Sequence, residues 1–96
     1  MKYYLLSWTT RDGDNEYGEE VIVKLAKPLN PLTVFRKVLK DFYFAEHGLE
    51  KVDEAGYCYE VRPDYRIHEY EAMDEITQAQ AKVLLETRAI GVDYKF

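Results

Sequence analysis

The side chains best suited to nucleophilic or metal chemistry in this 96-residue chain are one cysteine and two histidines, Cys58, His47 and His68. A thiolate nucleophile needs a base or a helix N-terminus beside it, and Cys58 lies between two tyrosines in a segment without a glycine-rich turn. One cysteine and two scattered histidines are also too few for a structural zinc site. We therefore expect no catalytic residue, no metal site and no internal disulfide.

Oxygen ligands and phosphate loops offer no better candidate. Carboxylates crowd residues 12–20, but counting from Asp12 places Tyr17 where a calcium-binding EF-hand loop requires glycine and Val23 where it requires glutamate. The five glycines are isolated, so no phosphate-binding loop is present and we expect no cofactor. A small enzyme or ligand-binding domain stays an alternative, because acidic residues are plentiful but none stands out as a general acid or base.

The tyrosines are the feature that most needs an explanation. Six of the nine fall in segments that we predict to be strands, namely Tyr3, Tyr4, Tyr57, Tyr59, Tyr65 and Tyr70. Aromatic side chains on a sheet can stack nucleic-acid bases, pair across strands inside the fold, or contact a partner protein. A nucleic-acid surface also needs clustered Lys and Arg, and the strands that carry Tyr59 and Tyr70 are acidic instead. Binding of single-stranded nucleic acid is therefore only an alternative.

The negative charge is confined to the C-terminal half. Seven Lys/Arg balance seven Asp/Glu in residues 1–48, whereas residues 49–96 hold six against eleven, and 6 − 11 = −5 is the net charge of the chain. Glu69, Glu71, Asp74 and Glu75 place four like charges within seven residues. Their repulsion disfavours folding slightly unless a basic partner offsets it. A solvated, solubilising surface is the simpler explanation of the same charges.

Alternating apolar residues predict the strands that position these side chains. We expect two antiparallel hairpins, the first with a turn at Asp12-Gly13 and the second with a turn at Pro63-Asp64. Their strands span residues 2–10 and 19–27, and residues 57–62 and 65–73. Strict alternation in the last strand places Met73 on the same face as Glu69 and Glu71, although the pattern there is imperfect.

Two helices follow the hairpins. Asn30 and Pro31 have the residue types of an N-cap and a first helical turn, and apolar residues then recur at helical spacing up to Gly48. Thr77 and Gln80 form a capping-box pattern before a second helix near residues 78–89. We expect residues 49–56 to form a loop, and residues 92–96 to form either an edge strand or a packed tail.

These elements predict a single α+β domain over residues 1–96. Its expected architecture is a two-layer sandwich in ββαββα order, with an antiparallel sheet of about four strands, both helices on one face and the other face open. No apolar run approaches the ~20 residues of a membrane span, and the N-terminus does not resemble a secretory signal. We therefore expect a cytoplasmic protein without a membrane partner.

The overall profile resembles that of small acidic single-domain proteins, including short reading frames of phages and other mobile elements. Our leading hypothesis is a non-catalytic module that binds a protein partner with a basic surface, for example an inhibitor that places carboxylates where a nucleic-acid-binding protein accepts phosphates. We expect no direct nucleic-acid contact, and a homodimer through the open sheet face is a further alternative. The predicted contact residues are Glu69, Glu71, Asp74, Glu75, Tyr59, Tyr70 and Trp8.

Overall fold

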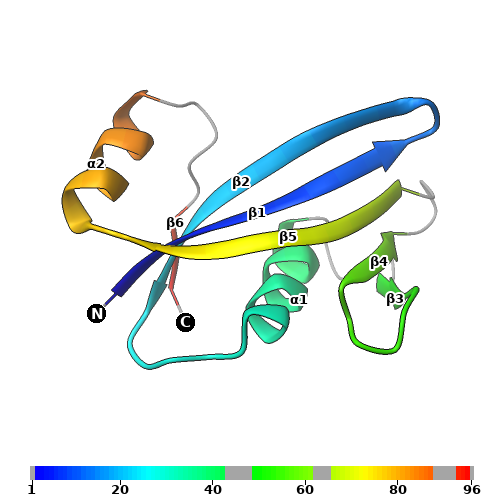
Figure 1. Cartoon of the computed structure of the whole chain (residues 1–96), viewed down its shortest axis with the longest axis horizontal. Helices are drawn as coiled ribbons and strands as arrows, with labels where there is room; N and C mark the ends of the chain where they lie inside the picture. Colours follow the sequence, from blue (N-terminus) through cyan, green and yellow to red (C-terminus); the bar gives the residue numbers. More distant parts are fainter. Residues whose placement is uncertain (1, 43–48, 62–65, 88–92, 96) are drawn as a thin grey trace.

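The computed structural model describes residues 2–42, 49–61, 66–87 and 93–95, and shows a six-stranded sheet with two helices (Figure 1). The strands are β1 (Lys2–Asp12), β2 (Asn15–Leu25), β3 (Leu49–Lys51), β4 (Cys58–Val61), β5 (Arg66–Ile76) and β6 (Asp93–Lys95), and the helices are α1 (Pro31–Phe42) and α2 (Gln78–Thr87). The strand order is β3-β4-β5-β1-β2-β6. Strand β6 runs parallel to β2 and every other neighbouring pair is antiparallel, which confirms the α+β class.

The β1–β2 hairpin is longer and its turn tighter than predicted. Asp12 pairs with Asn15, so only Gly13 and Asp14 form the turn. Gly13 has a φ of 63°, a left-handed conformation that glycine adopts without a steric penalty. Strand β2 therefore begins at Asn15 instead of residue 19. Strand β5 pairs with the other side of β1, which places β1 in the middle of the sheet.

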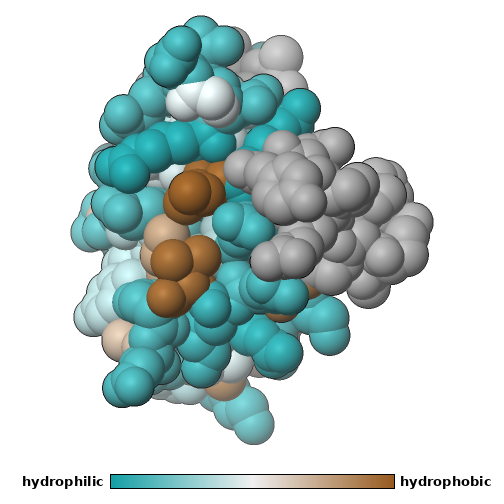
Figure 2. All heavy atoms as spheres, turned by 90° about the vertical axis from the view of Figure 1, so that its right-hand side faces the viewer, coloured by the Kyte–Doolittle hydropathy of each residue, from teal (hydrophilic) through white to brown (hydrophobic). Residues whose placement is uncertain are grey.

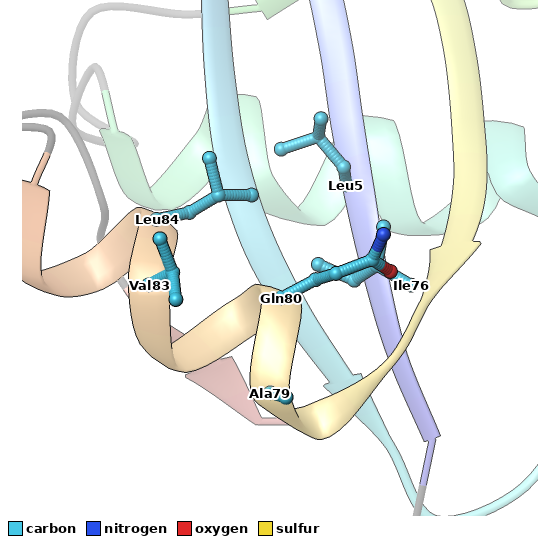
Figure 3. Close-up of a pocket in the computed structure, with 6 residues that line it drawn as sticks. All are labelled: Leu5, Ile76, Ala79, Gln80, Val83 and Leu84. Atoms are coloured by element: carbon cyan, nitrogen blue, oxygen red, sulfur yellow. The ribbon is translucent and has the colours of Figure 1, made fainter.

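The two helices cover opposite faces of the sheet. The neighbouring β1 residues Leu5 and Leu6 point to opposite faces, because side chains alternate along a strand. Leu6 packs in the main hydrophobic core with Phe35 of α1, whereas Leu5 lies beside α2. Figure 3 shows α2 on the near side of the strands and α1 behind them. The predicted two-layer sandwich with both helices on one face is therefore wrong. The layers are helix, sheet and helix.

The main core lies between α1 and the sheet. Four apolar side chains of α1 are fully buried, and their spacing of i, i+1, i+4 and i+5 places them on one side of the helix: Val34, Phe35, Val38 and Leu39. The Phe35 ring lies 5.9 Å from Trp8, 5.8 Å from Tyr59 and 5.7 Å from Tyr70, measured between ring centroids. Aromatic rings at this separation and tilt attract one another in addition to burying apolar area.

The predicted helix starts are confirmed by their hydrogen bonds. The backbone N–H of Leu32 donates to Oδ1 of Asn30 at 2.9 Å, which caps α1. At the start of α2, the Gln80 N–H donates to the Thr77 hydroxyl at 3.1 Å, and the Thr77 N–H donates to Oε1 of Gln80 at 2.8 Å. This reciprocal pair is the predicted capping box.

The sheet has six strands instead of about four. Residues 49–51, which we expected in a loop, form β3, and three residues are too few for alternation to reveal a strand in the sequence. For residues 92–96 we expected an edge strand or a packed tail, and residues 93–95 form the edge strand β6 beside β2. Asp53 stabilises the turn after β3, because its carboxylate accepts hydrogen bonds from the backbone N–H groups of Tyr57 and Cys58. The predicted turn at Pro63-Asp64 and the helix ends near Gly48 and Gly91 lie outside the described residues.

Candidate partner-binding face

An irregularity in β5 decides where its acidic residues point. Across the β1–β5 pair, Trp8 lies opposite Tyr70 and Ser7 lies opposite Ala72, so Glu71 is an extra residue in β5. Because of this extra residue, the β5 residues after Glu71 point to the faces opposite to those that strict alternation predicts. Met73 pairs with Leu6 and packs against the main core, which corrects its predicted place on the face of Glu69 and Glu71.

Asp74 and Glu75 change faces for the same reason. Asp74 lies opposite Leu5 and therefore shares a face with Glu69, which lies opposite Thr9. The Thr9 hydroxyl donates a hydrogen bond to Glu71, so Glu71 also belongs to this face. Glu75 lies on the opposite face and forms an ion pair of 3.4 Å with Lys2. Three of the four predicted carboxylates are thus brought together, and the fourth is separated from them.

We call the sheet face that carries Glu69 and Glu71 the acidic face. The registers of β1 to β5 bring seven carboxylates onto it, namely Glu16, Glu20, Glu50, Glu60, Glu69, Glu71 and Asp74. The cations that these strands place on the same face are Arg11 and Lys24, so the balance is 2 − 7 = −5. The five strands therefore gather on one face an excess equal to the net charge of the whole chain.

Like charges are close together at two places on the acidic face. Glu50 lies directly opposite Glu60, and Glu69 and Glu71 are two residues apart in β5, so each pair is about 5 to 7 Å apart. Glu16 and Glu20 are separated by Gly18 and lie two strands away from β5, with β1 between them. Arg11 offsets part of the negative charge locally through a contact of 3.8 Å with Glu16, and Lys24 lies over the ring of Tyr3. Apart from the atoms drawn in grey, the end of the molecule with the hairpin turn, β3 and β4 is mostly hydrophilic, with a few hydrophobic side chains among the hydrophilic ones (Figure 2).

The predicted aromatic contact residues face the other way. Trp8 is 1% exposed and Tyr59 is 3% exposed, and both lie in the main core under α1. Tyr70 is half-buried and packs against the same core. Burial raises the pKa of the Tyr59 and Tyr70 hydroxyls. In this structure Trp8 and Tyr59 stabilise the fold and expose almost no surface, so neither side chain belongs to the acidic face.

Cys58 lies on the acidic face but has the wrong surroundings for a nucleophile. It pairs directly with Glu69 across the β4–β5 ladder. Burial raises the pKa of its thiol, and the negative charges of Glu69 and Asp53 raise it further. The protonated thiol is therefore favoured at neutral pH, whereas a nucleophilic cysteine requires the thiolate.

A groove beside α2 is the main alternative site. It is open, has a volume of about 490 Å³, and is lined by Leu5, Ile76, Ala79, Gln80, Val83 and Leu84 (Figure 3). Its polar side chain, Gln80, accepts the hydrogen bond from Thr77 that caps α2. The groove therefore offers apolar contacts and no ionisable side chain, so its lining supplies no group for acid–base or nucleophilic chemistry.

Sequence reasoning missed four carboxylates of the acidic face, Glu16, Glu20, Glu50 and Glu60. Glu16 and Glu20 lie two strands away from Glu69, and Glu50 is paired with Glu60 through the unpredicted strand β3. Only the strand order and register place these four carboxylates on the same face as Glu69, Glu71 and Asp74. The signal available in the sequence was the even spacing of Glu16 and Glu20 with Ile22 in the predicted hairpin.

Comparison with known proteins gave no match: no family model, no curated protein and no solved structure is significantly similar to the chain. Within the described residues, no helix has the length and apolar character of a membrane span, and no group of three or more His, Cys, Asp or Glu side chains is arranged to hold a metal ion. The candidate site is thus defined by the fold and its charges: an α+β domain with one acidic sheet face.

Proposed function

We propose that the protein is a non-catalytic module whose acidic face binds a basic surface of a protein partner. The observation that carries this proposal is the gathering of seven carboxylates against two cations on one sheet face. Five of these carboxylate residues are exposed and two are half-buried. A dense, fixed array of anions attracts Lys- and Arg-rich surfaces and speeds their association.

A partner that normally binds nucleic acid fits this surface best. Such a partner has clustered Lys and Arg that contact regularly spaced phosphates. The acidic face offers seven carboxylates on one sheet, and the cross-strand pair of Glu50 and Glu60 is roughly 5 Å apart. The protein would then act as an inhibitor by occupying the partner's phosphate-binding surface. Binding of single-stranded nucleic acid has less support, because Trp8 and Tyr59 are buried and the exposed face is negative.

The test is a double charge reversal on the acidic face, Glu69→Lys with Glu71→Lys. The matched control is Asp41→Lys with Glu75→Lys, which changes the net charge equally but places the new charges on α1 and on the opposite sheet face. Proteins retained from the native host by the immobilised wild-type chain are identified by mass spectrometry. Their affinities for the three chains are then measured at low and physiological salt.

We expect the face reversal to weaken partner binding by more than about tenfold, mainly through slower association and most strongly at low salt. The control reversal should weaken it much less. Thermal stability should be unchanged or slightly higher in the face variant, because like-charge repulsion is relieved. If both double variants lost the same amount of affinity for the partner, or if the affinity did not change with salt concentration, the acidic face would be only a solubilising surface.

A further inference from the structure

Among the described residues, half of β2 has a neighbouring strand on one side only. Strand β6 pairs with β2 only at Ile22, Val23 and Lys24. The preceding residues, from Asn15 to Glu19, pair with β1 on one side, and no other described strand lies beside them. This part of the hairpin lies at the end of the sheet opposite to α2 (Figure 1). An unpaired strand edge presents backbone donors and acceptors to a further strand.

The hairpin geometry identifies which backbone groups point outward. In a two-residue hairpin the closing pair, here Asp12 and Asn15, is hydrogen-bonded, and hydrogen-bonded pairs then recur at every second position. The N–H and C=O groups of Tyr17 and Glu19 therefore point toward β1. Those of Glu16 and Gly18 point toward the open edge. Two outward-facing residues can form up to about four hydrogen bonds with an added strand.

Among the described strands, β3 and β6 also have an unpaired outer edge, but each has only three residues, and the part of β5 beyond β4 has an edge that is distorted. Strand β5 extends beyond its pairing with β4, but the extra residue Glu71 distorts it there. Bulges and covering groups are devices by which natural sheets prevent strand addition. Residues 15–19 have neither device: the register with β1 is regular, and Gly18 leaves the edge free of a side chain.

The charges at this edge select its occupant. A second copy paired antiparallel about Gly18 would place Glu16 opposite Glu20 and so bring like charges together, which is unfavourable. A strand with Lys or Arg at alternate positions would instead lie beside Glu16 and Glu20 on the acidic face. Its intervening side chains would pack on the other face beside Tyr17, which is 41% exposed.

We propose that residues 15–19 of β2 bind an extended Lys- or Arg-bearing segment of the partner protein as an added β-strand. This inference rests on the proposed function and specifies its mode of recognition. The backbone of Glu16 and Gly18 supplies hydrogen bonds, and the adjoining acidic face supplies the preference for cations. The second copy of this chain, which the sequence suggested as a partner, is disfavoured at this edge.

The decisive variant is Gly18→Pro, which removes one outward N–H without changing any charge. Proline is tolerated at an edge position whose N–H faces solvent, and a Cβ at residue 18 meets no atom within 4 Å. Gly18→Ala is the matched control, because it adds a Cβ and keeps the N–H. The probe is a peptide of about eight residues with alternating Lys and Val, and the control peptide has the same sequence with every backbone nitrogen methylated, so that it has the same charge but no backbone N–H donors.

We expect Gly18→Pro to weaken binding of the Lys-Val peptide by at least about tenfold, and Gly18→Ala to change it less than about twofold. The N-methylated peptide should bind the wild-type chain at least as weakly as the proline variant binds the unmodified Lys-Val peptide. Equal affinity of wild type and Gly18→Pro for the Lys-Val peptide would overturn strand addition. If the Glu69→Lys, Glu71→Lys reversal still weakened partner binding, the proposed function would survive that result.

Hydrogen exchange on the wild-type chain tests the same inference without a substitution. The amides of Tyr17 and Glu19 are bonded to β1 and should exchange slowly with or without peptide. The amide of Gly18 should exchange rapidly in the free protein and at least about tenfold more slowly with saturating Lys-Val peptide. Unchanged exchange of Gly18 in the complex would overturn the proposal, whether or not the proline variant folds.

Discussion

Nδ1 of His68 lies 2.8 Å from the hydroxyl oxygen of Thr10, and both residues are fully buried between neighbouring strands β5 and β1. The Thr10 hydroxyl has one proton and donates it to Glu19 over 3.2 Å. Its oxygen therefore accepts a hydrogen bond from the Nδ1–H of His68. This chain of polar groups fixes the tautomer of the buried imidazole and connects three strands of the sheet.

The buried imidazole makes stability depend on pH. Burial, assisted by the positive charge of Arg66, lowers the pKa of His68 to about 4. The folded state thus favours neutral His68, so its contribution is complete above the ordinary pKa of about 6.5 and is lost as the pH falls toward 4. We expect His68 to account for a loss of about 3 kcal/mol in the free energy of unfolding over this range. Urea unfolding of wild type and His68→Gln between pH 7 and pH 4 measures it, and identical pH slopes would contradict it.

Tyr59 should behave as a core residue. Replacing it with Ala removes a ring that is 3% exposed and packs against Phe35, and should lower the free energy of unfolding by about 3 kcal/mol. Tyr57 is two residues away and 48% exposed, so Tyr57→Ala should cost no more than about 1 kcal/mol. Chemical denaturation of both variants checks the difference. A stable Tyr59→Ala protein with faster partner dissociation would instead identify Tyr59 as a contact residue.

The cap of α1 should contribute measurably to folding. Asn30→Ala removes the acceptor of the Leu32 N–H and should lower the free energy of unfolding by about 1 kcal/mol. Asn30→Ser keeps an oxygen that can accept the same hydrogen bond and should restore most of that loss. Thermal and urea unfolding give both values, and the cap would have no energetic role if the two variants were equally stable.

The chain should not bind nucleic acid appreciably at physiological salt. The acidic face repels phosphates, and the buried positions of Trp8 and Tyr59 prevent them from stacking bases. Fluorescence anisotropy with labelled single-stranded and duplex oligonucleotides should show no saturable binding at micromolar concentrations. Micromolar or tighter affinity that falls steeply with salt would replace the proposed function with single-strand binding.

The sequence by itself determined the local structure of the chain. Asn30 and Thr77 cap their helices through hydrogen bonds to residues two or three positions away, and such interactions depend on neighbouring residues only. The antiparallel hairpins were likewise predictable, because a turn at Gly13 and the alternation of apolar side chains are local patterns. The same patterns identified the α+β class and the acidic segment of β5.

Only the tertiary structure decided which side chains share a surface. The alternation of side chains along a strand places Leu5 and Leu6 on opposite faces of the sheet, but it does not determine which helix covers each face. The extra residue Glu71 reversed the faces of the β5 residues that follow it. The order of the strands placed Glu16 on the same face as the acidic residues of β5 and buried Trp8 under α1. These outcomes depend on contacts between segments that are far apart in the chain. Local patterns are compatible with several ways of packing the helices on the sheet, and the free energy of burying apolar surface selects one of them.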